Sequence, residues 1–224
     1  AFNCKKKEHV MSEILYIAAN ALSSQSMYVQ SNFYLNIAKF LNENFHSYDT
    51  LLAENFYKID NLKKAKKIYN NLSKNGEAFH WYSSKQLANI LIQQDNKNEA
   101  YKLVKKSYEG LIKKKIYETF DYAEFLKNNE KFAEAIPLYT IILDNVEKKH
   151  PLYSEAADGR GVSYERIGNW NKAEKDLIAS LEVNPDQAYV INYLAYTWIE
   201  KGIKVKKSLN MLKKANKLRS NDPY

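Results

Sequence analysis

The side chains best suited to metal binding or nucleophilic catalysis are few and far apart in this sequence. The four histidines, His9, His46, His80 and His150, lie at least 34 residues from one another, and Cys4 is the only cysteine. A metal site would place histidines at i,i+4 or several cysteines at short spacing. The sequence therefore predicts no metal site and no cofactor.

Carboxylates and glycines offer two further kinds of chemistry. Glu155, Asp158 and Glu165 fall on one face of an expected helix, where carboxylates could act as general acid and base. Nothing beside them marks a nucleophile, and a solvated or peptide-binding face would carry the same charges. The segment Gly159-Arg-Gly161 lacks the Lys-Ser/Thr that ends a phosphate loop. We expect no catalytic residue and no enzyme; an enzyme would need a cleft with perturbed carboxylates.

Positive charge is the third feature with a chemical meaning. The 224 residues include 34 Lys and Arg against 26 Asp and Glu, which gives a net charge of +8 and a pI near 9.2. Such a charge suits nucleic acid or an anionic membrane surface. Only three of the basic residues are arginines, the side chain that pairs bidentately with bases and phosphates. A scattered lysine coat is the preferred interpretation, and nucleic-acid binding is the alternative.

The elements that position these side chains are expected to be helices. Six glycines and four prolines are too few for the many turns of an all-β fold. No apolar run approaches the roughly 18 residues that cross a bilayer, so we expect a soluble protein without a transmembrane segment. Because Ala1 stands in place of Met, we also expect that a tag or targeting segment has been removed.

A sequence period indicates how the helices are arranged. Small residues recur with separations of 34, 35, 35, 38 and 35 residues, at Ser31, Ala65, Ala100, Ala135, Ala173 and Ser208. A second small residue precedes each of them by 12 or 13 positions, at Ala19, Ala53, Ala88, Ala123, Gly161 and Ala195. Two helices approach to about 8–10 Å only where the side chains at their crossing are short. The period therefore predicts six helical hairpins.

The fifth copy of the period has the most complete set of recurring residues: Gly161, Tyr164, Gly168, Ala173, Leu177 and Pro185. On this set, in six tandem copies, the chain resembles the tetratricopeptide-repeat (TPR) family, whose 34-residue unit is a helix-turn-helix. Arg160 departs from the family pattern, which prefers Leu there. The last copy is similar to large bacterial TPR proteins of the alphaproteobacterial type. The resemblance implies an all-α, right-handed superhelical solenoid, in the bacterial cytoplasm or in the periplasm or cell envelope.

We expect a single domain that covers nearly the whole chain. The predicted helices are 12–24, 28–42, 47–58, 61–74, 79–93, 97–113, 116–128, 132–147, 152–167, 170–183, 186–200 and 205–218. The repeats are predicted at about 12–45, 46–80, 81–115, 116–153, 154–187 and 188–220. Residues 1–11 are expected to form an N-terminal tail, and residues 221–224 resemble the joint to a further repeat.

The resemblance places a partner-binding groove on the first helices of the repeats. By their register, the expected groove residues are Tyr16, Glu54, Tyr57, Tyr82, Lys85, Asn89, Tyr117, Phe120, Glu124, Asp158, Glu165, Tyr189, Asn192 and Tyr196. Tyrosine supplies rigid contact area and a hydroxyl group, a common combination at interfaces. Packing of some of these rings between repeats is an alternative that the sequence leaves open.

The expected partner is a protein, as an extended peptide or a helix in the groove. The charged groove positions are Lys58, Lys85, Lys127 and Arg166 against Glu13, Glu54, Glu124, Glu155, Asp158, Glu165 and Glu200, so the groove is net acidic. Lys85 with Asn89 resembles half of the clamp with which some TPR proteins hold the acidic tail of a chaperone. Asp121 and Glu155 stand where that clamp needs other side chains, which disfavours an acidic tail, and the acidic groove disfavours nucleic acid.

The last predicted helix, 205–218, keeps Leu209, Met211, Leu212 and Leu218 among its lysines. A final helix of a solenoid needs a polar outer face unless something covers it. We expect that the chain is a fragment of a longer array, or that it self-associates through its C-terminal repeat. The alternative is that lysine stems shield the apolar face.

Overall fold

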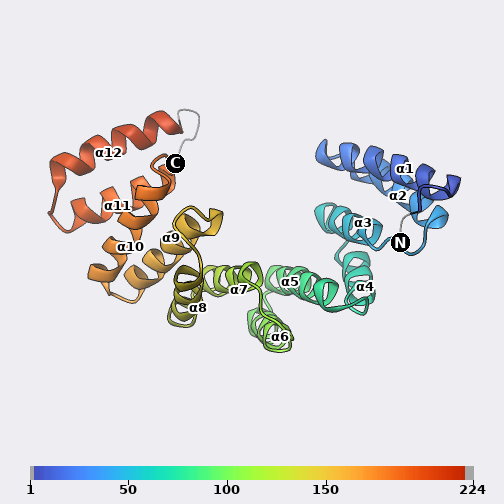
Figure 1. Ribbon diagram of the computed structural model, residues 1–224, viewed down its shortest axis with the longest axis horizontal. Helices are drawn as coiled ribbons and strands as arrows, with labels where there is room; N and C mark the ends of the chain where they lie inside the picture. Colours follow the sequence, from blue (N-terminus) through green and yellow to red (C-terminus); the bar gives the residue numbers. More distant parts are fainter. Residues whose placement is uncertain (1–2, 220–224) are drawn as a thin grey trace. The chain divides into compact units, whose positions relative to one another are not determined.

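The computed structural model describes residues 3–219, and these residues form twelve α-helices and no strand (Figure 1). The helices are α1 (Lys7–Ser24), α2 (Tyr28–Leu41), α3 (Ser47–Lys58), α4 (Leu62–Leu72), α5 (Glu77–Gln93), α6 (Lys97–Glu109), α7 (Ile116–Asn128), α8 (Phe132–Asn145), α9 (Pro151–Arg166), α10 (Trp170–Val183), α11 (Ala188–Glu200) and α12 (Val205–Leu218). The predicted all-α class is confirmed. Residues 7–11, expected in an N-terminal tail, belong to α1 instead. The expected joint at residues 221–224 lies outside the described residues.

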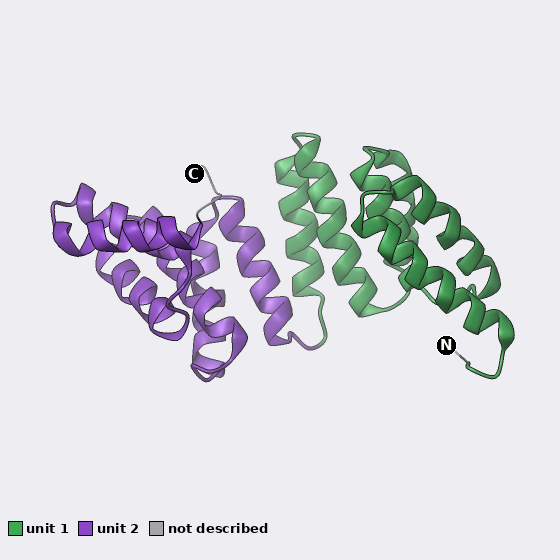
Figure 2. Ribbon diagram, turned by 90° about the horizontal axis from the view of Figure 1, so that it is seen from above, with its two compact units in different colours: residues 1–112 green, residues 113–224 purple. Residues whose placement is uncertain are grey.

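The chain divides into two compact units, residues 1–112 and residues 113–224 (Figure 2). Unit 1 contains the hairpins α1–α2, α3–α4 and α5–α6, and unit 2 contains α7–α8, α9–α10 and α11–α12. Within each unit, a first helix packs on its own second helix, which packs on the next first helix. Since α5 begins at Glu77 and α9 at Pro151, residues 77–80 and 151–153 belong to the hairpin after the one we expected. A single domain over all six hairpins stays a prediction.

The small residues of the period lie at the helix crossings, as predicted. All twelve are buried: Ala19, Ser31, Ala53, Ala65, Ala88, Ala100, Ala123, Ala135, Gly161, Ala173, Ala195 and Ser208. A Cβ atom on Gly161 would lie only 3.2 Å from the backbone oxygen of Ala173 and 3.0 Å from Cγ of Leu177. The helices of a hairpin therefore approach closely because their crossing side chains are short.

Every hairpin turns through the same backbone motif. The residue seven positions after the first small residue has a φ between 58° and 82°, at Ser26, Asp60, Asp95, Glu130, Gly168 and Gly202. The next amide donates to the carbonyl five residues earlier, as Asn169 does to Tyr164 at 2.8 Å and Met27 to Leu22 at 2.9 Å. This bond closes the open end of the first helix. The recurring turn sets the direction in which each second helix leaves.

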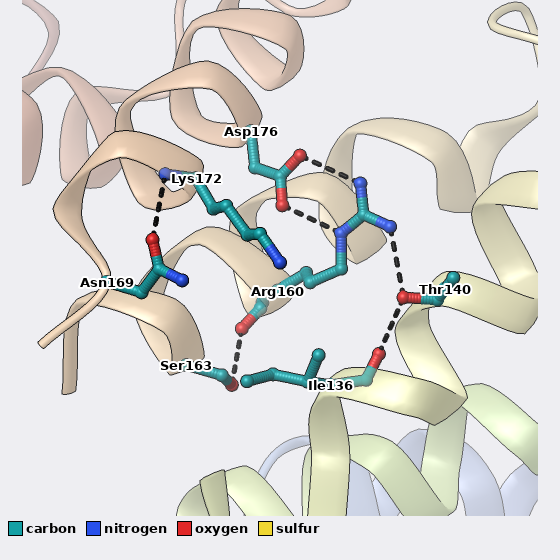
Figure 3. A network of polar contacts seen from close by, with 8 residues as sticks. Ile136, Thr140, Arg160, Ser163, Asn169, Lys172 and Asp176 are labelled. Carbon is teal, nitrogen blue, oxygen red and sulfur yellow. Dashed lines mark hydrogen bonds and ion pairs between the residues drawn. The ribbon is translucent and has the colours of Figure 1, made fainter. Parts of the chain in front are cut away.

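Arg160, the residue that departs from the repeat pattern, joins three helices of unit 2 (Figure 3). Its Nε and Nη2 atoms donate to Oδ2 and Oδ1 of Asp176 at 2.7 and 2.8 Å, and its Nη1 atom donates to Oγ1 of Thr140 at 3.1 Å. Both charged side chains are largely buried. The guanidinium group of α9 thus fastens α8 and α10 where a leucine would only contribute apolar contact.

Most lysines lie on exposed positions of the second helices and the loops. The exposed residues include Lys63, Lys64 and Lys67 on α4, Lys113, Lys114 and Lys115 before α7, and Lys206, Lys207, Lys213, Lys214 and Lys217 on α12. Among residues 3–219, no helix is both long and apolar enough to cross a membrane. The positive charge is therefore spread over both units.

Candidate functional site

A pocket of about 460 Å³ lies between α9 and α11 in unit 2. We call it the α9–α11 pocket, and its walls are Glu165, Arg166, Tyr189, Asn192, Tyr193, Tyr196, Thr197, Glu200 and Arg219. Side chains three, four and seven positions apart share one face of a helix, which brings the residues of α11 together. The pocket contains six of the predicted groove residues, Glu165, Arg166, Tyr189, Asn192, Tyr196 and Glu200.

Tyr193 forms a fixed part of the pocket wall. Its hydroxyl donates to Oε2 of Glu165 at 2.6 Å. Burial, together with this hydrogen bond to a carboxylate, raises the pKa of Tyr193, so the hydroxyl stays protonated. The ring of Tyr189 lies 5.9 Å from that of Tyr193, at an interplanar angle of 36°. The bond therefore holds the centre of the pocket in one geometry.

Tyr189 and Tyr196 provide the aromatic area that is open to a partner. The Tyr189 and Tyr196 side chains are 50% and 59% exposed, whereas the Tyr193 side chain is partly buried. Large apolar side chains at this level of exposure are available for contact, and their hydroxyls for hydrogen bonds. The arrangement offers two accessible rings beside a rigid third one.

Charges of both signs accompany the rings. Arg166 Nε lies 3.7 Å from Oε2 of Glu165, and the lining also includes Glu200 and Arg219. Asn192 adds an amide group that can both donate and accept a hydrogen bond. The pocket can therefore pair with the backbone and the charged groups of a peptide.

A second group of predicted residues surrounds Asp158, and we call it the Asp158 cluster. Glu124 accepts a hydrogen bond from the Tyr139 hydroxyl at 2.5 Å and pairs with Lys127 at 2.8 Å. The Oδ1 atom of Asp158 is buried and has no hydrogen-bond partner. Burial raises the pKa of Asp158 from 3.8 to about 6; Lys127 opposes the rise, while Glu124 and Glu155 add to it. Charge at Asp158 is therefore unfavourable in the folded protein near neutral pH.

Gly159 makes room for the ring beside this cluster. A Cβ atom at Gly159 would lie 2.5 Å from Cζ of Tyr139, whose side chain is fully buried. Phe120 packs near the same ring at a centroid distance of 6.3 Å. Of the predicted residues on α7, Tyr117 is the exposed one, with its ring 6.0 Å from His150.

Among residues 3–219, no group of three or more His, Cys, Asp or Glu is placed to hold a metal ion.

In unit 1 the predicted groove tyrosines take part in packing between helices. Tyr16 contacts Tyr48 at 5.2 Å, and both Tyr57 and Tyr82 pack against the apolar cluster around Ala53 and Tyr69. These rings therefore pack between repeats, which is the alternative that the sequence left open. Their role in binding stays a prediction.

The polar groove residues predicted in unit 1 have mixed surroundings. Glu54 accepts a hydrogen bond from the Tyr82 hydroxyl, and burial followed by this bond raises the pKa of Tyr82. Lys85 places its Nζ atom 5.5 Å from the Trp81 ring centroid, while Asn89 is exposed. Unit 1 therefore offers fewer accessible groove side chains than the α9–α11 pocket.

Sequence reasoning missed Tyr193, Thr197 and Arg219 as pocket residues. Glu165 and Tyr193 are separated by 28 residues, like the hydrogen-bonded pair Glu54 and Tyr82, but the two pairs stand at different positions of the repeat. Tyr193, Thr197 and Arg219 therefore had no recurring signal in the sequence.

Several solved structures are similar to this chain in fold. MamA (MSR-1 C2) has a TM-score of 0.56 at 17% identity, covering 78% of this chain and 97% of that chain. The chain has the tetratricopeptide-repeat fold. The Cut9-Hcn1 hetero-tetramer of the APC/C has a TM-score of 0.66 at 13% identity, covering 98% of this chain and 44% of that chain. The C-terminal part of a TPR repeat-containing protein from Cytophaga hutchinsonii has a TM-score of 0.60 at 13% identity, covering 92% and 79%.

These similarities concern the TPR fold. No family model matches the sequence, and the comparison with curated proteins finds no relative.

Proposed function

We propose that this chain is a non-catalytic TPR module that binds a peptide segment of a protein partner in the α9–α11 pocket. The observation that carries the proposal is the pocket itself, with exposed Tyr189 and Tyr196 beside the fixed Tyr193. Its volume of about 460 Å³ is within the range of ligand sites, roughly 300–1,000 Å³. Aromatic anchors of this kind supply much of the binding energy at protein interfaces.

The pocket chemistry favours a peptide with one bulky anchor and polar flanks. Tyr189 and Tyr196 suit an aromatic or branched side chain, while Asn192 can bind an exposed peptide group. Glu165 and Arg166 provide opposite charges for the flanking residues. The Cut9-Hcn1 structure, which is similar in fold, is a hetero-tetramer, and this assembly supports the proposal.

The perturbed carboxylate Asp158 does not make an enzyme the better proposal. A raised pKa of about 6 is a property of some catalytic carboxylates. However, the unpartnered Oδ1 atom of Asp158 is buried, and the side chain is not part of the α9–α11 pocket wall. A reacting group in the pocket would have no access to this atom.

Selection from a random peptide library displayed on phage tests the proposal without knowledge of the natural partner. The full chain is the only target, without counter-selection, and a Tyr189→Ala/Tyr196→Ala variant is kept for the binding measurements. We expect selected peptides to bind the unsubstituted chain in calorimetry and to lose at least about tenfold in affinity with the double variant, a loss of about 1.4 kcal/mol.

Ile141→Ala is the matched control for the selection, because Ile141 is a half-exposed apolar residue on the second helix α8. This control should bind the selected peptides with unchanged affinity. Peptides that bind both the double variant and the unsubstituted chain equally would overturn the pocket as the binding site.

A further inference from the structure

Helix α1 exposes two apolar side chains, one of them at a position that is covered in four other hairpins. Ile14 and Ile17 are 55% and 67% exposed. Ile14 stands five positions before the first small residue of its hairpin. The residues at this position in α3, α5, α9 and α11 are Tyr48, Ser83, Ala156 and Val190, and they are 0–2% exposed. Each of these four helices follows a second helix within its own unit.

The side chain that covers such a first helix comes from a fixed position of the preceding second helix. This position is four residues after the second small residue, at Leu35, Tyr69, Tyr139 and Leu177. Tyr139 lies against Gly159 of α9, and the ring of Tyr69 lies 6.1 Å from that of Tyr82 on α5. Leu35 shares an apolar cluster with Leu51, and Leu177 shares one with Val190. At all four junctions the residue at this position therefore packs toward the next first helix.

Helix α12 presents the complementary stripe, and no first helix of residues 3–219 packs against that side. Leu212 occupies the covering position, and Val205 and Leu209, on the same face, are 54% and 52% exposed. In α10 the residue equivalent to Leu209 is Glu174, which accepts a hydrogen bond of 2.7 Å from Nε1 of Trp198 on the next first helix. The stripe of α12 is therefore the side on which a following first helix packs.

We propose that copies of this chain associate head to tail, with the Val205/Leu209/Leu212 stripe of α12 docked on Ile14 and Ile17 of α1 in a second copy. Within the described residues, no second helix precedes α1 and no first helix follows α12. The contact would continue the junction that both units already contain. Leu212 would meet Ile17 in the register in which Tyr139 meets Gly159. Leu35 and Leu51, two members of one apolar cluster, occupy the same two positions. This inference uses surfaces outside the α9–α11 pocket and does not depend on the proposed function.

The two docking faces are different surfaces, which determines how the association grows. In a pair, one copy keeps its α1 face free and the other keeps its α12 face free. Such a heterologous contact continues beyond the dimer unless it closes into a ring. The average mass in solution should therefore rise past that of a dimer as the protein concentration increases.

Sedimentation velocity over a wide concentration range tests the proposal with the full chain and two variants. Ile17→Glu places a charge on the α1 face and Val205→Glu places one on the α12 face, both at exposed positions, so each variant should remain folded by circular dichroism. We expect each variant alone to be monomeric. An equimolar mixture of the two should form a one-to-one dimer and nothing larger, because one intact face of each kind remains.

Phe40→Glu is the matched control, since Phe40 is an exposed apolar residue on α2 outside this register. The equivalent residues of the next hairpins, Lys74, Glu109 and Asp144, are charged and exposed, and the variant should associate like the unsubstituted chain. A monomeric unsubstituted chain at all concentrations would overturn the proposal. So would association of either variant alone, or a mixture that stays monomeric.

Discussion

At the scale of single residues, the contact between Gly159 and Tyr139 shows how closely α8 and α9 pack. The buried Tyr139 ring occupies the space of a side chain at Gly159, and its hydroxyl is held by Glu124 at 2.5 Å. The ring therefore cannot move aside without losing this bond. Position 159 therefore requires glycine, although the repeat pattern does not call for glycine there.

We predict that Gly159→Ala destabilises the protein by about 1–3 kcal/mol, because the new methyl group overpacks the junction. Urea unfolding followed by circular dichroism measures the change. Tyr139→Leu removes the ring, so adding Gly159→Ala to this variant should have a much smaller effect. Equal losses in the presence and absence of the ring would show that the contact does not limit the packing.

Asp158 leads to a prediction about pH. Its pKa is raised in the folded state, from 3.8 to about 6, so the folded state holds the proton more tightly than the unfolded state does. Stability therefore falls as the pH rises from about 4 to above 6, and the loss is constant at higher pH. A shift of this size corresponds to about 3 kcal/mol at most, at about 1.4 kcal/mol per unit.

Asp158→Asn removes this unfavourable charge. We expect the variant to be about 1–3 kcal/mol more stable than the unsubstituted chain at pH 7.5, with the difference shrinking toward zero near pH 4. Thermal unfolding at both pH values tests the prediction. A difference that is the same at both pH values would assign the effect to something other than ionisation.

At the scale of the elements, the sequence predicted the features that recur in every hairpin. The small residues at all crossings could be predicted because helix contact tolerates only short side chains there, and the helix limits followed from the same period. The partial burial of Tyr82 and the exposure of Tyr117 could not be predicted, although both stand six positions before the first small residue. Their surroundings differ because Tyr82 donates a hydrogen bond to Glu54 and packs against the ring of Tyr69, whereas the ring of Tyr117 packs near His150.

The ion pair of Arg160 and Asp176 is an element-scale contact whose removal has two different outcomes. Asp176→Ala leaves the largely buried guanidinium without its carboxylate, so we expect a loss of about 3 kcal/mol. The double variant Arg160→Leu/Asp176→Leu restores the leucine of the repeat pattern and should be close to the unsubstituted chain in stability. Urea unfolding of both variants measures this. A double variant as unstable as Asp176→Ala would mean that the bidentate pair itself stabilises the unit.

At the scale of the whole molecule, the lysines lead to a prediction about nucleic acid. Exposed lysines occur in both units, and only three arginines are present. We expect no saturable binding of single-stranded RNA in fluorescence anisotropy at about 0.15 M salt, a concentration that screens scattered surface charges beyond about 8 Å. Saturable binding that weakens steeply with salt would instead support the lysine-mediated alternative.

The fold of the molecule was predictable from its period, but the location of the pocket was not. The register placed groove residues along all the first helices. It could not show that Tyr193 and Arg219 complete a pocket in unit 2, because Arg219 follows α12 and belongs to no recurring position. Neither could it show that Tyr16, Tyr57 and Tyr82 pack between helices in unit 1.

Hydrogen-deuterium exchange of the full chain with and without a selected peptide is the most direct test of the α9–α11 pocket as the binding site. Bound peptide should slow exchange in α9 near Glu165 and along α11 from Tyr189 to Glu200, the residues of the pocket wall. Helix α8 around the control residue Ile141 should be unchanged. Slower exchange in unit 1 or on the second helices, with α9 and α11 unchanged, would contradict the account.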